Sequence, residues 1–393
     1  MNTDTTHEIV VLGAGYAGLI ATARLARYTR KSDTRITVVN PSSRFTERLR
    51  MHQVAAGQKL TDFRIPDLLT GTGVEFRQGV ATAIDTTGRQ VRLDDGAVLH
   101  YDTLVYALGS TTDTSIVPGA ADHAWTLNDP RTAHHFSERL PEIAAAGGTV
   151  TVCGGGLTGI EAAAEIAEAY PALTVELVSA AELGAMMGDK ARAHLNRALD
   201  RLGVVRRVGV KVDKVLPDAV RLDTGELVGS DLTLWTTGVR VSPLATESGI
   251  ATTAQGLIIT DSTLRSVSHP DIHAIGDAAL VRQPWGQLHG TCQSGVVTAD
   301  YTATVIARLL RGKAPKPLRF GYFHQPVSLG RKDAVVQFTR ADDTPARWYL
   351  TGKAAVIYKE QVSGTPPVAA KMSRYVKMPV QLSKGGRATR KVA

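Results

Sequence analysis

The chain contains little cysteine, few aromatic residues and no long apolar run. Its 393 residues include only two cysteines, Cys153 and Cys292, so a disulfide framework is excluded and a reducing compartment is expected. The uncharged run 143–160 is rich in glycine and threonine, so it is interpreted as loop, strand and turn instead of a membrane span. No secretory signal is expected, because a strand is predicted from Glu8. No metal site is predicted.

Acidic residues are absent after Glu360, although the net charge of the whole chain is only +8. Residues 371–393 are therefore predicted to form a solvated basic tail, with contact to an anionic membrane surface as the alternative. Nucleic acid binding is not expected, because no reading module accompanies the charge. The basic residues of this segment are Lys371, Arg374, Lys377, Lys384, Arg387, Arg390 and Lys391.

Two glycine-rich turns are the most informative feature that is present. They are Gly13-Ala14-Gly15-Tyr16-Ala17-Gly18 and Gly154-Gly155-Gly156-Leu157-Thr158-Gly159. Each follows a short apolar run and opens a helical pattern, as in a dinucleotide-binding βαβ unit. The first glycine permits a tight turn, the next allows the backbone to approach a pyrophosphate, and the last allows close helix packing. Two such turns predict two dinucleotides held face to face, which is how a flavin takes hydride from a pyridine nucleotide.

The elements around each turn follow one plan, which indicates a duplicated nucleotide-binding fold. Strands are predicted over 8–12, 34–39 and 103–107 in the first half and over 149–153, 174–178 and 232–236 in the second. Antiparallel hairpin strands are predicted over 74–78, 80–84 and 90–93, and over 212–216 and 219–222. Residues 257–259 and 273–277 are expected as strands, 296–310 as a helix and 320–360 as strands with turns, whereas the segment after Gly364 has weak periodicity.

Several motifs together resemble those of pyridine-nucleotide-dependent flavoproteins with two nucleotide-binding domains. The nearest branch is that of the type II NADH:quinone dehydrogenases and the related apoptosis-inducing-factor-like oxidoreductases. The resemblance covers about residues 7–338, and besides the two glycine turns its carriers are residues 101–109, 235–239, 275–277 and 328–334. It implies an α/β protein with a duplicated Rossmann-like fold and a small C-terminal α+β module. The expected domains are 1–122 with 244–319 for FAD, 123–243 for NAD(P)H, 320–370 for the C-terminal module and 371–393 for the basic tail.

The resemblance also implies which residues bind the cofactors. Asn40 stands where an acid usually binds the ribose of FAD, and Ser179 stands at the ribose position of the second half. With neither an acid nor an arginine there, the prediction leans only weakly to NADH over NADPH. The FAD site is expected to comprise Gly13, Gly15, Tyr16, Ala17, Gly18, Asn40, Ala81, Ala107, Gly109, Gly276 and Asp277, and the NAD(P)H site Gly154, Gly155, Gly156, Thr158, Gly159, Ser179 and Gly238.

Four residues are candidates for the chemistry. Glu161 is expected near the nicotinamide, with a helix-surface acid as the alternative. The quinone-binding stretch of the branch carries alanine-glutamine and a second glutamine four residues later. Here it reads Cys292-Gln293-Ser294-Gly295-Val296-Val297, so only the first glutamine is kept. Cys292 is interpreted as a packing residue or a site-lining one, and His289 as a structural residue or a proton donor to the acceptor.

The predicted function is that of an FAD-dependent NAD(P)H dehydrogenase. Hydride passes from nicotinamide C4 to flavin N5, and two electrons then pass to an acceptor, most simply a quinone. One alternative is an enzyme of the same fold acting on a biosynthetic metabolite or a small electron-transfer protein. Another is a flavin-binding redox sensor or interaction protein with little turnover. A cytoplasmic location is expected, with peripheral contact to the inner face of the membrane and a homodimer left open.

Overall fold

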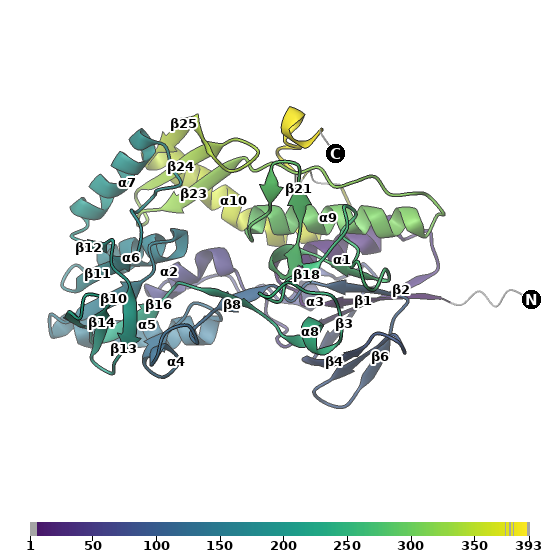
Figure 1. The fold of residues 1–393 in the computed structure, drawn as a ribbon, viewed down its shortest axis with the longest axis horizontal. Coiled ribbons are helices and arrows are strands. Elements are labelled where there is room, and N and C mark those ends of the chain that lie inside the picture. Colours follow the sequence, from purple (N-terminus) through teal and green to yellow (C-terminus); the bar gives the residue numbers. More distant parts are fainter. Residues whose placement is uncertain (1–5, 374, 377–378, 380, 391–393) are drawn as a thin grey trace, which may run out of the picture.

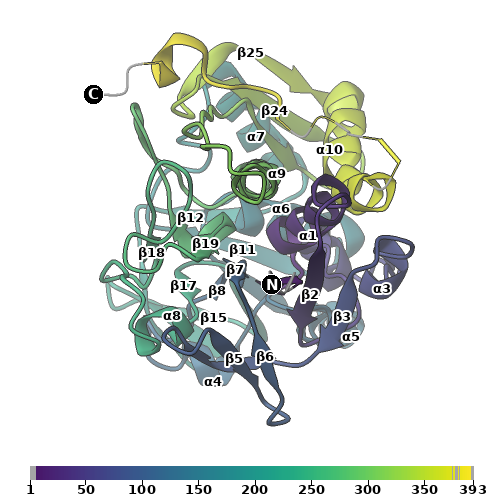
Figure 2. The ribbon, with the colours of Figure 1, turned by 90° about the vertical axis from the view of Figure 1, so that its right-hand side faces the viewer.

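Two parallel sheets organise the chain in a computed structural model, which describes residues 6–373, 375–376, 379 and 381–390. The first sheet has the order β19-β7-β1-β2-β3, and all of its strand pairs are parallel. Helices α1 (Tyr16–Tyr28) and α9 (Cys292–Leu309) pack against each other beside it (Figures 1 and 2). The strands are β1 (His7–Leu12), β2 (Thr34–Asn40), β3 (Glu75–Gln78), β7 (Thr103–Tyr106) and β19 (Ile272–Ala274).

The strand at residues 75–78 corrects one expectation. It was predicted as part of an antiparallel hairpin, but β3 pairs in parallel with β2 at the edge of the main sheet. Its four side chains are partly buried or exposed, because an edge strand contacts the core on fewer sides, so its sequence lacks the apolar run of a central strand. The strands that follow do form an antiparallel sheet: β4 (Ala81–Asp85), β5 (Gln90–Leu93) and β6 (Val98–His100).

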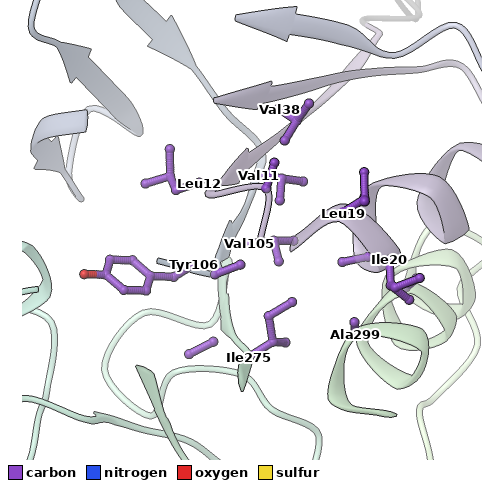
Figure 3. Close-up of a cluster of buried hydrophobic side chains, with 14 of the residues drawn as sticks. Val11, Leu12, Leu19, Ile20, Val38, Val105, Tyr106, Ile275 and Ala299 are labelled. Atoms are coloured by element: carbon purple, nitrogen blue, oxygen red, sulfur yellow. The ribbon is translucent and has the colours of Figure 1, made fainter. Parts of the chain in front are cut away.

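The core beneath α1 and α9 is built from strand side chains that alternate between the two faces of the first sheet. Val11 and Leu12 of β1, Val38 of β2 and Val105 of β7 are completely buried. Figure 3 shows Val11 and Val105 on the side of the sheet that faces Leu19 and Ile20 of α1 and Ala299 of α9, and Leu12 on the other side with Tyr106. Strand β19 pairs with β7, and α9 packs on α1, so this core joins segments that lie more than 150 residues apart in the sequence.

The second sheet repeats the parallel arrangement in the order β12-β11-β10-β16-β9. Its strands are β9 (Ala124–Trp125), β10 (Thr149–Cys153), β11 (Thr174–Ser179), β12 (Val205–Val208) and β16 (Leu232–Trp235). The accompanying helices are α4 (Ala120–His123), α5 (Pro130–Ala145), α6 (Leu157–Ala169) and α7 (Asp189–Arg201). A small antiparallel sheet, β13 (Val212–Val215), β14 (Ala219–Leu222) and β15 (Leu227–Gly229), takes the place that β4 to β6 have in the first half.

The chain passes twice between the two sheets. The outward and return segments, β8 (Ser110–Thr112) and β17 (Val239–Val241), pair in antiparallel fashion and form a two-stranded connection visible between the two lobes of Figure 1. Shorter elements of the first half and of the return are η1 (Arg48–Arg50), α2 (Met51–Ala55), α3 (Ile65–Leu68), α8 (Leu244–Glu247), β18 (Ile258–Ile259), η2 (Gly276–Ala278), β20 (Ala279–Leu280), β21 (Arg282–Gln283) and β22 (Gly286–Gln287).

The C-terminal module is a three-stranded antiparallel sheet followed by a helix. Its strands are β23 (His324–Ser328), β24 (Ala334–Thr339) and β25 (Pro345–Thr351), and its helix is α10 (Gly352–Met372). Residues 352–360 are therefore helical instead of extended as predicted. The helix contains Pro366 and Pro367, which interrupt the apolar period and explain why the sequence pattern was weak there.

Part of the predicted basic tail packs back onto residues 319–321, ahead of the C-terminal sheet. Gln381 donates to the carbonyl of Arg319, and the amide of Gly321 donates to that of Ser383, ahead of a short helix η3 (Gly386–Thr389). Arg374, Lys377 and Lys391 of the tail lie outside the described residues. Within the described residues, every helix is too short or too polar to cross a bilayer.

Candidate active site

The first glycine turn is locked by its neighbours. Gly13 has φ +92°, and a Cβ on it would lie 2.6 Å from the carbonyl oxygen of Ala107. A Cβ on Gly18 would lie only 1.8 Å from the carbonyl oxygen of Gly13, whereas one on Gly15 would meet no atom within 4 Å. Gly13 and Gly18 are thus required by the fold itself, and Gly15 leaves open space at the start of α1. That space, at a helix N-terminus, has the form that a pyrophosphate needs.

Asn40 holds this turn from the side. Its side-chain oxygen accepts the amide of Ala14 at 2.9 Å, and its side-chain nitrogen donates to the carbonyl of Ser42 at 2.7 Å. The residue predicted to contact a ribose therefore also fixes the glycine turn, at the end of β2.

The second glycine turn repeats the geometry. Gly154 has φ +126°, and a Cβ on Gly159 would lie 1.8 Å from the carbonyl oxygen of Gly154. Thr236 takes the place of Ala107, with its hydroxyl bonded to the carbonyl of Cys153 at 3.0 Å. A Cβ on Gly155 would clash with Ser179, whose hydroxyl donates to the carbonyl of Ala181 at 2.6 Å and closes its own turn.

One cavity of about 1770 Å³ connects the two halves and the C-terminal module. Of the predicted site residues, the fold brings together around it Gly13, Gly15, Tyr16, Ala17, Asn40, Ala81, Ala107, Gly109, Thr158, Glu161, Gly238, Gly276, Asp277, His289, Cys292 and Gln293. The remaining predicted residues lie outside its lining: Gly18, Gly154, Gly155, Gly156, Gly159 and Ser179. The cavity is large enough for a dinucleotide, and its glycine cradle fits one.

Glu161 is a buried acid in the second turn of α6. Its Oε1 is 2.6 Å from Nζ of Lys359 on α10 and accepts the amide of Ser328 at 3.0 Å. Burial alone would favour the neutral acid, but the Lys359 ammonium and the Ser328 amide hold the pKa of Glu161 below its usual value. The interpretation as a helix-surface acid is thus wrong, since Glu161 and Lys359 form a buried ion pair in the cavity wall.

The duplicated fold and the cavity are matched by one family model, pyridine nucleotide-disulphide oxidoreductase, over residues 7–298. The chain belongs to this family. It is an oxidoreductase, its cofactors are FAD and NAD(P)H, and the predicted fold class is confirmed.

Individual relatives agree with the family. A NADH dehydrogenase-like protein of Mycobacterium tuberculosis is 30% identical over 84% of this chain and 87% of its own length. The type II NADH:quinone oxidoreductase of Staphylococcus haemolyticus is 26% identical over 90% of this chain and 94% of its own length. Among solved structures, the sulfide:quinone oxidoreductase of Aquifex aeolicus superposes with a TM-score of 0.81 at 17% identity, covering 95% of this chain and 96% of that one. This last likeness concerns the fold alone.

In this oxidoreductase, Glu161 belongs to a larger group of buried charges. His52 of α2 lies between Glu161 and Glu165, with its ring nitrogens 3.6 and 3.9 Å from their carboxylates. Burial lowers the pKa of His52 to about 4, so the ring is neutral at neutral pH. Arg331 pairs with Glu165 at 3.2 Å and with Glu360 at 2.5 Å. The group joins α2 of the first domain, α6 of the second and the C-terminal module at one point.

Cys292 lines the cavity at the first residue of α9, beside Tyr16. Burial raises the pKa of its thiol to about 12, and the carboxylate of Asp277 adds to the effect. The thiol therefore stays protonated at neutral pH, which excludes a resting thiolate nucleophile. Cys153 lies in the core on β10, as predicted for a packing residue, and is 1% exposed.

The stretch predicted to bind the acceptor, residues 292–297, forms the first turns of α9. Gln293 lines the cavity, but Val297 is buried in the apolar core and 3% exposed, so the position of the second glutamine offers no polar contact to a ligand. Thr291 caps the helix in a capping box with Ser294, which fixes the direction in which Cys292 and Gln293 begin it.

Several polar cavity residues were not predicted. Arg48 donates to the carbonyl of Ser110, whose hydroxyl donates to Asp277 at 2.7 Å. Lys359 lies in a stretch expected to be extended, so no helical pattern pointed to it. The one available signal was the recurrence of arginine at positions 44, 48 and 50. The polar residues of the cavity wall that were not predicted include Arg48, His52, Ser110, Tyr322, His324, Asp343, Tyr358 and Lys359.

Proposed function

We propose that this oxidoreductase is an NAD(P)H dehydrogenase that passes two electrons through FAD to a quinone. The observation that carries the proposal is the continuous cavity. It begins at Glu161 and Gly238 in the second domain, passes the glycine cradle of the first, and ends between α9, β23 and α10. A donor and an acceptor can thus both reach the middle of one cavity. The name of the staphylococcal relative, a type II NADH:quinone oxidoreductase, supports the same choice of acceptor.

FAD, when bound, supplies the two-electron chemistry between nicotinamide and acceptor. The residues of the chain bind the two nucleotides and orient them. Gly13, Gly15 and Asn40 hold the dinucleotide at the start of α1, and Asp277 binds it from the other side of the cradle. Glu161, fixed by Lys359, positions the nicotinamide end, where small displacements have large effects on rate.

The nucleotide is proposed to be NADH instead of NADPH. Ser179 at the end of β11 uses its hydroxyl in its own turn, and Ala180, Ala181 and Glu182 follow it. This segment offers no cation for a 2′-phosphate, and Glu182 would repel one. We expect NADPH to reduce the enzyme at least tenfold less efficiently than NADH, as measured by kcat/KM.

The test is stopped-flow reduction of the purified flavoprotein by NADH, followed by mixing with a soluble quinone such as menadione. Rapid loss and rapid return of flavin absorbance are expected. If the flavin absorbance falls rapidly with NADH but does not return with quinone, the enzyme is still an NADH dehydrogenase. Its acceptor is then a protein or a metabolite instead of a quinone. A protein that binds no FAD would reject the whole proposal.

We further propose peripheral contact with an anionic membrane, where quinones reside. Support comes from exposed apolar side chains on and after the last turn of α10, namely Val368, Met372, Tyr375, Val376 and Leu382. Exposed Lys371, Lys384 and Arg387 accompany them. Such a combination inserts apolar groups and attracts anionic headgroups. Co-sedimentation with vesicles containing phosphatidylglycerol is expected to weaken in Lys371→Glu/Lys384→Glu and at high salt, and to be absent with zwitterionic vesicles.

A further inference from the structure

The acceptor end of the cavity holds a histidine that is fixed on three sides. The ring of His289 stacks on that of Tyr322, with centroids 4.4 Å apart and planes 11° apart. Its Nε2 is 3.0 Å from Oδ2 of Asp343. The Tyr322 hydroxyl donates to the His289 carbonyl at 2.6 Å and accepts from its amide at 3.0 Å. Both the backbone and the ring plane of His289 are thus held by one tyrosine and one carboxylate.

Asp343 reaches His289 from a strained turn of the C-terminal module. It lies between β24 and β25 with φ +63°, a conformation that a residue other than glycine adopts only at a cost in free energy. Its side chain is 10% exposed, and its Oδ1 is buried with no hydrogen-bond partner among the described residues. A largely buried carboxylate with one oxygen unsatisfied and the other on an imidazole is a costly arrangement, so stability alone does not account for it.

The second ring nitrogen of His289 is available. The described part of the chain provides no hydrogen bond to Nδ1, and the side chain is 55% exposed while it lines the cavity. The ring therefore has one nitrogen on a carboxylate and the other open to a ligand and to water. A carboxylate that fixes one nitrogen of an imidazole in this way sets the orientation of the ring and the direction in which its other nitrogen points.

We propose that His289, positioned by Asp343 and Tyr322, binds an oxygen of the acceptor through Nδ1 and delivers a proton to it. This inference rests on the proposed function, quinone reduction. Reduction of a quinone to a hydroquinone takes a hydride, and with it both electrons, from the reduced cofactor, and one further proton. In this step His289 acts as the imidazolium: its Nδ1–H proton passes to the second quinone oxygen, and the ring regains a proton from hydronium or buffer acid in the solvent. It provides the polar contact that Val297, buried in the core, does not.

Three variants test the inference. His289→Phe keeps a ring to stack on Tyr322 but removes both nitrogens. Asp343→Asn keeps the size of the side chain and tolerates a positive φ, but removes the charge. His100→Phe, at an exposed position of β6, is the matched control. Reoxidation of the reduced flavoprotein by menadione should slow about 10²-fold in His289→Phe and by a smaller factor in Asp343→Asn. Reduction by NADH should stay within about twofold, and the control should match the wild type.

A second measurement does not depend on turnover. Binding of a hydroxyquinoline N-oxide, an analogue that is not reduced, is followed by its perturbation of the oxidised flavin spectrum. The Kd is expected to rise about tenfold in His289→Phe. In His289→Ala, added imidazole should restore part of the reoxidation rate, and the same addition to His289→Phe should not.

The outcomes separate the two proposals. If quinone reoxidises the wild-type enzyme, and His289→Phe keeps the wild-type reoxidation rate and analogue Kd, the role of His289 is overturned alone. If quinone does not reoxidise the wild-type enzyme, the proposed function and this role are overturned together. Slower NADH reduction in His289→Phe would also contradict the role, because it would place the defect on the donor side.

Discussion

At the scale of single residues, Gly15 and Gly18 separate what the fold needs from what the cofactor needs. Gly18→Ala places a Cβ 1.8 Å from a backbone oxygen, so we expect a loss of at least about 2 kcal/mol in the free energy of unfolding. Gly15→Ala meets no protein atom, so it should unfold like the wild type without flavin but bind FAD poorly. Urea unfolding and the ratio of flavin to protein absorbance check both. Equal stability of Gly18→Ala and wild type would contradict the argument.

The ion pair of Glu161 and Lys359 gives a second prediction. Each group is 8% exposed, so removing one leaves the other as an uncompensated buried charge. Glu161→Gln or Lys359→Met should each cost about 3–5 kcal/mol, and the double variant less than the sum of the two. A double-mutant cycle from urea unfolding measures the coupling. If the two substitutions have additive effects on the free energy of unfolding, the contact between Glu161 and Lys359 contributes little to stability.

At the scale of elements, the N-terminus of α9 decides where the acceptor residues lie. The Thr291 hydroxyl accepts the amide of Ser294 at 3.1 Å, and the Ser294 hydroxyl accepts the amide of Thr291 at 3.0 Å. Thr291→Ala removes the helix cap and should lower the free energy of unfolding by about 1 kcal/mol. Reoxidation by quinone should also slow, because the first turn of α9, which begins with Cys292 and Gln293, would fray. Thr291→Ser retains the hydroxyl and is the control. Chemical denaturation and stopped-flow reoxidation provide the readouts.

Most elements were predictable where the apolar period was regular. The strands at 8–12 and 149–153 are apolar runs that are buried except at their first residues, and a glycine turn follows each, so their pattern is unambiguous. The parallel pairing of residues 75–78 was not predictable. Four residues of mixed polarity at the edge of a sheet do not indicate whether the strand runs parallel or antiparallel to its neighbour. The helix at 352–372 was missed because Pro366, Pro367 and the small residues between Ser363 and Ala370 blur its period.

At the scale of the whole molecule, three buried histidines predict acid sensitivity. Burial lowers the pKa of His52 and His324 to about 4 and that of His273 to about 3. Unfolded histidine titrates near 6.5, so the unfolded chain binds more protons between about pH 4 and 6.5, and stability falls as pH falls through this window. Burial raises the pKa of Glu47 and Glu165, which acts in the opposite direction.

The expected loss is roughly 1–2 kcal/mol per histidine between pH 7 and pH 5. Urea unfolding of the flavoprotein across that range measures it. His273→Leu should flatten the slope by about one proton, because that ring lies in the first-domain core, where its Nδ1 has no hydrogen-bond partner among the described residues. An unchanged slope would show that His273 is not the titrating group.

The sequence by itself determined the duplicated α/β plan, the two glycine turns and most residues of the dinucleotide cradle. These features depend on local rules. Buried strands have apolar runs in their sequence, and only glycine fits where a Cβ would meet a backbone oxygen. Tertiary structure alone decided the partners of Glu161 and His289. Lys359 and Asp343 lie 198 and 54 positions further along the chain, in a module that neither turn specifies. Ion pairs and ring stacking between distant segments leave no period in a sequence, because only the packed core brings their side chains into contact.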